Sequence, residues 1–104
     1  MSKFSLFGKF TVQEGKRDTM VEILLEAAKS MKDLDECEIY IVNISETEPN
    51  AIHVYEVWSN EEAHQASLSL EATQTLINRA KPIITGMERI NILSAIGGKG
   101  ISSN

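Results

Sequence analysis

The sequence predicts an α+β fold in which four strands form an antiparallel sheet and the helices cover one face of it. Three observations support this prediction. The chain has 104 residues, which is room for one domain. Its hydrophobic residues recur with a period of two in some segments, as in strands, and of about 3.6 in others, as in helices. These segments follow one another as βαββαβ, the order of a ferredoxin-like sandwich.

The first strand is expected over residues 4–12 and the first helix over residues 16–31. In the strand the even positions are apolar and share one face, except that Gly8 leaves a gap in it. A ligand or another chain could approach the backbone closely at that gap. In the helix, apolar side chains recur at helical spacing: Met20, Leu24, Ala27, Ala28 and Met31.

Two further strands are expected over residues 37–45 and 51–58. The earlier one is rich in β-branched residues and apolar on both faces near its centre, which predicts a strand covered on both sides. The later one places Glu56 and Trp58 on one face.

A second helical region should follow at once. Ser59 with Glu62 three residues later matches a capping box, so the helix is expected to begin with Ser59 as its N-cap. The helix should break near residues 67–69 and restart, and Pro82 should then end or bend it, with Gly86 as a further candidate stop.

The last strand is expected over residues 87–96, with Ile90 and Ile92 on one face. These elements together predict one domain over residues 1–97. Residues 98–104 are rich in glycine and serine, and we expect a flexible C-terminal tail there.

The sheet face turned away from the helices should be apolar, since it is expected to carry Ile39, Ile41, Tyr55 and Val57. A patch of that breadth is unfavourable in water, and the chain offers no third layer to cover it. A second copy is the simplest cover, so we expect a homodimer through this face of the sheet.

The charge of the chain argues against several kinds of partner. Its net charge is −5, and the longest basic run is Lys16–Arg17. Nucleic acids and anionic membrane surfaces both require a dense basic surface, so neither is an expected partner. No apolar run approaches the roughly 18 residues that span a bilayer, and the N-terminus does not read as a secretory signal. We expect a cytoplasmic location.

Few residues are suited to metal binding or nucleophilic catalysis. The only cysteine is Cys37, and the two histidines are not spaced as a ligand pair, so we expect no metal site. Acidic neighbours should raise the pKa of Cys37, which argues against a nucleophilic thiolate.

Three residues near the end of the strand over 51–58 are the main candidates for a site. Glu56 alternates with apolar residues on a buried face, so it is either paired structurally or a pocket carboxylate that acts as a base. Trp58 either fills the core or forms the wall of a pocket for flat ligands. His64 is either a solvated helix residue or a second candidate base. Tyr40 and Gly8 are the further candidates for contact with a ligand.

Residues 56–64, which include Glu56 and Trp58, resemble the antibiotic biosynthesis monooxygenase family, where a Glu-x-Trp precedes a short helix rich in Glu and Ala. Other stretches agree in order and spacing. Residues 8–18 resemble the family's first strand and helix start, residues 37–42 its second strand, and residues 82–86 its Pro-Leu-(Leu)-x-Gly ending. The likeness covers about residues 4–96.

This resemblance implies a dimeric α+β barrel of two ferredoxin-like protomers. Some members oxidise quinols or anthrones with O₂ and without a prosthetic group. A heme-degrading branch uses an Asn, the Trp and a helix His. Here Gly8 stands at the Asn position, and the His position falls on Ser67 or Leu68, so His64 comes about one turn early. The resemblance therefore argues against heme degradation.

The resulting hypothesis is a monooxygenase that uses no cofactor and acts on a small aromatic molecule such as a quinol. Its catalytic residues would be Glu56 and His64, and its substrate-binding residues Trp58, Tyr40 and Gly8. One alternative is a non-catalytic, dimeric small-molecule-binding or stress-related module of the same fold. Another is an isomerase of a sugar-like metabolite, which would hold phosphate through one of three arginines: Arg17, Arg79 or Arg89.

Overall fold

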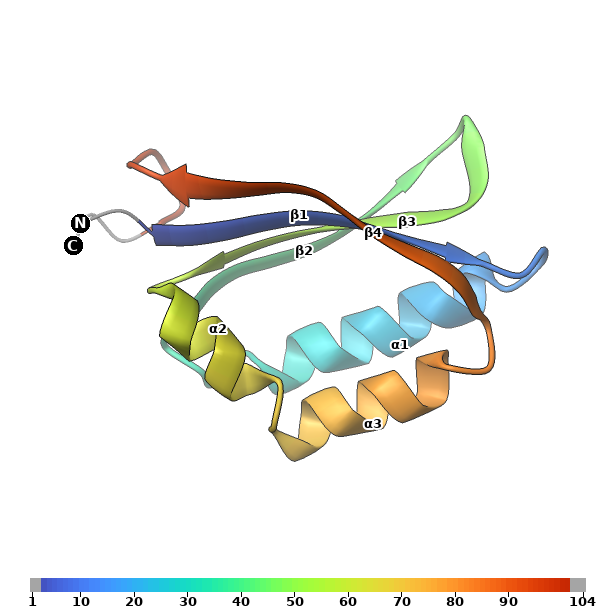
Figure 1. Cartoon of the computed structure of the whole chain (residues 1–104), viewed down its shortest axis with the longest axis horizontal. Helices are drawn as coiled ribbons and strands as arrows, with labels where there is room; N and C mark the ends of the chain where they lie inside the picture. The colour runs from blue at the N-terminus through green and yellow to red at the C-terminus, as the bar shows by residue number, and fades with distance from the viewer. Residues whose placement is uncertain (1–2, 102–104) are drawn as a thin grey trace.

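The computed structural model describes residues 3–101 and contains a four-stranded sheet with three helices. The elements, in chain order, are β1 (Lys3–Val12), α1 (Arg17–Ser30), β2 (Cys37–Ser45), β3 (Glu48–Trp58), α2 (Glu61–Ser67), α3 (Glu71–Ala80) and β4 (Ile84–Ala95). All three strand pairings are antiparallel, in the order β2-β3-β1-β4. The helices lie on one side of the sheet (Figure 1). The predicted ferredoxin-like α+β fold is therefore confirmed.

The sheet has two faces with different surroundings. We call them the helix-facing face and the outer face. Leu6 pairs with Glu56 and Gly8 with Val54, and residues directly opposite in a ladder point to the same side. Leu6 and Val54 are buried under the helices. This places the even positions of β1 and β3 on the helix-facing face, as their hydrophobic alternation predicts.

Helix α1 supplies the core residues that face β3 from the helical layer. It follows a turn in which Gly15 has a φ of 80°, a conformation that glycine adopts without steric cost. Its buried residues are Met20, Ile23, Leu24 and Ala27. The Arg17 guanidinium donates to the Ser45 carbonyl at 3.1 Å and fixes the start of the helix to the β2–β3 hairpin.

The helix that follows β3 begins one residue later than predicted. Asn60 is its N-cap, and the Asn60 Oδ1 accepts a hydrogen bond from the Ala63 N–H at 2.8 Å. The prediction of Ser59 as the cap is wrong, because the Ser59 N–H donates to the Glu36 carbonyl at 2.8 Å and holds this residue at the end of the sheet.

The predicted break in the second helical region is confirmed. Helix α2 ends at Ser67, whose hydroxyl donates to the His64 carbonyl at 2.6 Å, and α3 begins at Glu71. Serine side chains compete in this way for helix carbonyls. Helix α3 ends at Ala80, shortly before Pro82, as the sequence predicts.

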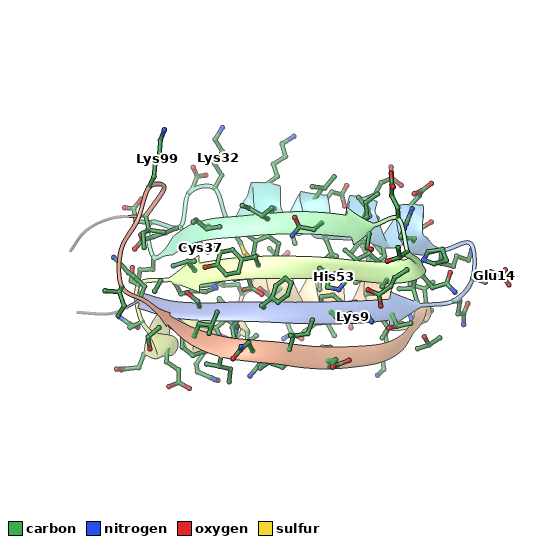
Figure 2. All side chains as sticks on the ribbon, turned by 90° about the horizontal axis from the view of Figure 1, so that it is seen from above. Lys9, Glu14, Lys32, Cys37, His53 and Lys99 are labelled. Carbon is green, nitrogen blue, oxygen red and sulfur yellow. The ribbon has the colours of Figure 1, made fainter. Side chains whose placement is uncertain are left out.

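The outer face carries aromatic and aliphatic side chains and is partly open to solvent (Figure 2). Phe7 stacks on His53 with ring centroids 5.8 Å apart and meets Tyr55 edge-on at 6.5 Å. Ile41 is 50% exposed. Within one chain the helices cover only one side of β2, since no helix lies over the outer face. The expected cover of the outer face by a second copy stays a prediction.

One end of the outer face is covered by the chain itself. The segment after β4 runs across that end towards β2 (Figure 2), and the backbone at Gly100 approaches the Ile39 side chain. Ser5 and Val57 are fully buried there, and the Lys3 ammonium lies 2.6 Å from a Glu38 carboxylate oxygen. Of the tail predicted over residues 98–104, residues 102–104 lie outside the described residues, and its flexibility stays a prediction.

The core predicts a sharp contrast between two adjacent leucines of α1. Leu24 is 0% exposed and Leu25 is 52% exposed. We expect Leu24→Ala to lower the free energy of unfolding by about 2–5 kcal/mol, because it leaves a cavity among packed side chains. Leu25→Ala should change it by less than about 0.5 kcal/mol. Urea denaturation at one fixed protein concentration measures both, and equal losses in the two variants would contradict this core.

Candidate functional site

A cavity of about 670 Å³ lies between the helix-facing face of the sheet and the helices α2 and α3. It exists because α1 packs against β2 and β3, whereas α3 packs mainly against α1 and leaves space over β1 and β4. Most of its lining is apolar. The sheet contributes Gly8, Tyr40, Glu56 and Arg89 to the lining, and α2 contributes His64.

Glu56 is the acidic centre of this cavity. As residues i and i+2 of one strand, Glu56 and Trp58 share a face, and the Trp58 indole N–H donates to the Glu56 Oε1 at 2.9 Å. Burial raises the pKa of the Glu56 carboxyl, and the indole hydrogen bond and the charge of Arg89 lower it by smaller amounts. The result is a carboxyl group that takes up a proton more readily than one in water.

Trp58 lies behind the cavity and does not line it. Its side chain is 1% exposed, and in this structure it contacts Glu56 and His64. The indole therefore holds the carboxylate in place. Stacking of a ligand on Trp58 stays a prediction that a bound ligand has to test.

Tyr40 lies directly across the β2–β3 ladder from Glu56, so its ring reaches the same cavity. Burial strongly raises the pKa of the Tyr40 hydroxyl, with further increases from the negative charge of Glu56 and from Cys37. The phenol is consequently neutral near pH 7 and can donate a hydrogen bond. The pKa of Cys37 is also raised, to about 11, mainly by burial and then by the charge of Glu56. The direction is the predicted one, but the main cause is burial and not the acidic neighbours in the sequence.

His64 is 5% exposed, so the alternative of a solvated helix residue is wrong. Its ring lies 5.7 Å from the Trp58 ring and 5.4 Å from the Phe4 ring, measured between centroids. The buried Nδ1 atom has no hydrogen-bond partner among residues 3–101. Burial lowers the pKa of His64, Arg89 lowers it further, and Glu61 raises it by less. A neutral imidazole with one unpaired nitrogen thus lines the cavity.

Gly8 forms part of the sheet surface beneath the cavity, on the same face as Val54. A Cβ atom there would stand 3.6 Å from the Glu88 carbonyl oxygen, an ordinary contact. The glycine is thus not required by backbone crowding, and its effect is to leave the cavity deeper at this point.

The sequence did not indicate which of the three candidate arginines lies at the site, and the structure does. Arg17 donates to backbone carbonyls, and Arg79 forms an ion pair with Glu26. Only Arg89 lines the same cavity as Glu56. Thr73, which sequence reasoning missed, also lines it, and its buried hydroxyl has no partner among residues 3–101.

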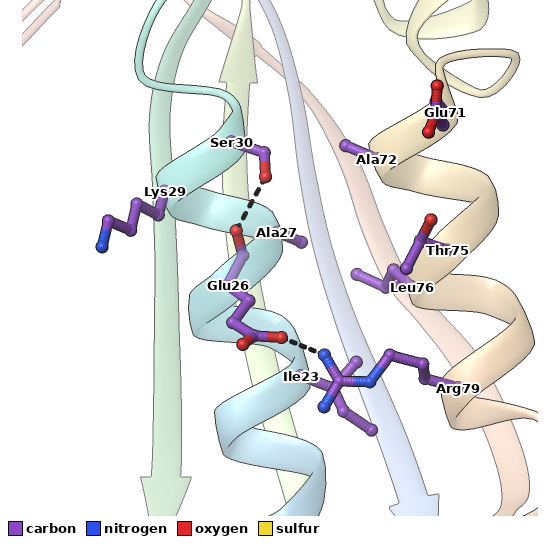
Figure 3. A pocket seen from close by; sticks show the side chains of 10 residues that line it. All are labelled: Ile23, Glu26, Ala27, Lys29, Ser30, Glu71, Ala72, Thr75, Leu76 and Arg79. Atoms are coloured by element: carbon purple, nitrogen blue, oxygen red, sulfur yellow. Dashed lines mark hydrogen bonds and ion pairs between the residues drawn. The ribbon is translucent and has the colours of Figure 1, made fainter.

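A second hollow lies on the far side of the helices, between α1 and α3 (Figure 3). The ion pair between Glu26 and Arg79 bridges it, and the Ser30 hydroxyl donates to the Glu26 carbonyl at 3.0 Å. None of the five predicted site residues lines this groove. The cavity at the sheet is therefore the better candidate for a functional site.

Two further searches cover the described part of the chain. No three His, Cys, Asp or Glu side chains within residues 3–101 gather where they could hold a metal ion. Among those residues there is also no helix with the length and apolar character needed to cross a bilayer.

Fold and cavity together define a small α+β domain with a largely apolar site between sheet and helices. The chain belongs to the antibiotic biosynthesis monooxygenase family, whose pattern it matches over residues 4–79. This confirms the resemblance found in the sequence. No match to a curated protein reaches significance.

Solved structures agree with this assignment. A candidate antibiotic biosynthesis monooxygenase from Chloroflexus aurantiacus is 34% identical, with a TM-score of 0.86 over 96% of this chain and 99% of that one. Another from Caulobacter crescentus is 18% identical, with a TM-score of 0.82 over 92% of each chain, and supports the fold alone.

The partly buried carboxyl group of Glu56 leads to a prediction about the dependence of stability on pH. Because the folded-state pKa of Glu56 is raised above its unfolded value, its stabilising effect is present at acidic pH and is lost as the pH rises through the folded pKa. Glu56→Gln keeps an acceptor for the Trp58 indole and removes the titration. We expect the variant to have the larger free energy of unfolding at pH 7 and to lose this advantage below pH 4.5, the ordinary value for the group.

Urea denaturation between pH 4 and 8 measures this difference. Glu22→Gln, which removes an exposed carboxylate of α1, is the matched control and should follow the wild-type curve. Parallel pH profiles for Glu56→Gln and the wild type would show that Glu56 is not desolvated.

Proposed function

We propose that this protein is a monooxygenase that oxidises a small aromatic substrate such as a quinol with O₂ and without a prosthetic group. The observation that carries the proposal is Glu56, a partly buried carboxylate that lines a largely apolar cavity and is held by a hydrogen bond from Trp58. Family membership supports the monooxygenase class.

The proposed reaction begins with proton removal from a phenolic hydroxyl. The resulting phenolate is rich enough in electrons to pass one to O₂, and the two radicals combine at a ring carbon. For a hydroquinone, loss of water then leaves a hydroxyquinone. One oxygen atom of O₂ enters the product, the other leaves as water, and the substrate supplies all four electrons.

Glu56 is the proposed base, because its raised pKa brings the carboxylate closer to the range in which a base is effective near neutral pH. Trp58 is a positioning residue that orients the Glu56 oxygen. Tyr40 can donate a hydrogen bond to a substrate oxygen from across the ladder. His64, with its unpaired Nδ1, is the second candidate for the base.

The cavity also bears on the alternatives. A non-catalytic module predicts a pocket filled by side chains or lacking perturbed groups, whereas this one is open and contains three groups with shifted pKa values: Glu56, Tyr40 and His64. An isomerase of a sugar-like metabolite needs a polar site, and this lining is mostly apolar. Both observations favour an aromatic substrate.

Oxygen uptake tests the proposal. Purified protein with a panel of hydroquinones should consume O₂ faster than the uncatalysed reaction, as measured with an oxygen electrode. Glu56→Gln should lower kcat by about 10²–10⁴-fold, because the base is lost. Trp58→Phe should lower it by about tenfold, because the carboxylate loses its hydrogen bond.

Glu22→Gln is the control for oxygen uptake and should keep the wild-type rate, since Glu22 is exposed on α1. Uptake at the uncatalysed rate with every quinol of the panel would overturn the proposed function.

The outer face supports the further proposal of a homodimer. Its open part carries Phe7, Ile41, Tyr55 and Leu93, a set typical of protein interfaces rather than of solvated surface. A two-fold axis through this face would cover the aromatic cluster in both copies.

Sedimentation velocity at micromolar concentration tests the dimer. The wild type should sediment as a dimer, and Ile41→Lys should shift it towards monomer because it places a charge within the interface. Leu25→Lys, on the far side of the molecule and 52% exposed, should remain dimeric. A monomeric wild type would rule out the interface.

A further inference from the structure

An irregularity in β4 determines where Arg89 points. From Leu93 to Asn91 the outer positions of β4 pair with Ser5 and Phe7 of the outer face. Strict alternation would place Arg89 on that face too. The register shifts between Phe7 and Gly8, so that Arg89 lies opposite Gly8. Because Gly8 belongs to the helix-facing face, the bulge brings Arg89 to the cavity.

The Arg89 guanidinium forms no ion pair and donates no hydrogen bond to a carboxylate or carbonyl within residues 3–101. The other arginines of the chain do have partners: Arg17 donates to carbonyls, and Arg79 pairs with Glu26. The adjacent Glu88 pairs in the ladder with Lys9, and both residues also line the cavity, where the Lys9 ammonium is already paired with Glu48. Arg89 is thus an unpaired cation at the cavity.

The charge of Arg89 acts on two ionisable groups of the site, Glu56 and His64. It lowers the pKa of both Glu56 and His64, in each case as a contribution smaller than burial. The side chain is exposed at the mouth of the cavity, and the glycine opposite it places no side chain beside it on this face. A ligand in the cavity therefore meets the guanidinium at one end and Glu56 further in.

We propose that Arg89 binds an anionic oxygen of the ligand, either a carboxylate or an ionised phenol. The planar fork of a guanidinium matches such oxygens and forms short, charge-assisted hydrogen bonds with them. The chain has a net charge of −5, which repels anions, so local cations favour the entry of an anionic aromatic molecule. Lys9 and Lys81 also line the cavity, but Arg89 is the cation whose charge acts on both Glu56 and His64. The inference rests on the proposed site, but not on its reaction with O₂.

This assignment complements the role of Glu56. When a base removes a phenolic proton, it leaves a negative charge on the substrate oxygen. In an apolar cavity this charge is unfavourable unless another group stabilises the anion. Arg89 supplies that stabilisation in a cavity with a largely apolar lining, where water competes less with the guanidinium. Specificity would follow, because a neutral analogue leaves the guanidinium without a partner.

Isothermal titration calorimetry with two isosteric probes tests the inference. The wild type should bind 2-naphthoate about tenfold more tightly than 2-naphthamide, the value expected for one partly exposed charged hydrogen bond. Arg89→Gln should abolish this preference by weakening 2-naphthoate alone. Arg79→Gln changes the net charge equally but lies in the other groove, and should keep the preference.

A second probe distinguishes the two sources of the anion. Binding to the wild type should lower the apparent pKa of 4-nitrophenol, read from the absorbance of its phenolate, and Arg89→Gln should remove the shift. A preference for naphthoate with no shift assigns the site to carboxylates. Circular dichroism confirms that each variant is folded, and Arg89→Lys should restore part of the preference.

The inference is overturned if the wild type binds both naphthalene probes equally or binds neither, or if Arg89→Gln retains the preference. Its failure is distinct from that of the proposed function. Anion selectivity without oxygen uptake would leave Arg89 assigned and remove the monooxygenase. Oxygen uptake that is unchanged in Arg89→Gln would keep the monooxygenase and remove the assignment of Arg89.

Discussion

The hydrogen bond from the Trp58 indole to Glu56 is the interaction on which the site depends. A carboxylate inside an apolar cavity is costly unless something satisfies its oxygens. The indole supplies one donor, the Tyr40 ring lies across the ladder, and Arg89 adds positive charge at the mouth. The same burial that makes Glu56 unfavourable for stability makes it suited to proton transfer, a common relation at functional sites.

The position of α3 decides whether that carboxylate has any space in front of it. Helix α1 fills the region under β2 and β3, but α3 rests on α1 rather than on the sheet. The helix-facing face over β1 and β4 is therefore hollow, and Gly8 deepens it. The outer face carries aromatic residues on the other side of the same strands, so one sheet provides both the proposed site and the proposed dimer interface.

Much of this architecture was predictable, since it depends on local patterns. The alternation in β1 and β3, the apolar stripe of α1, the break near Ser67 and the stop before Pro82 all follow from neighbouring residues. The predicted N-cap of α2 was wrong by one position, because the Ser59 N–H donates to the carbonyl of Glu36, which is distant in the sequence. Four predicted residues, namely Gly8, Tyr40, Glu56 and His64, do line one cavity.

The sequence by itself determined the fold, the family and the place of Glu56 beside Trp58 on one strand face, because a period of two needs no knowledge of distant contacts. Only the tertiary structure decided that Trp58 lies behind the cavity, that His64 is buried, and that Arg89 faces inward. These outcomes depend on the separation of α3 from the sheet and on a one-residue bulge between β1 and β4. Both arise from pairing between segments far apart in the chain, which local spacing does not encode.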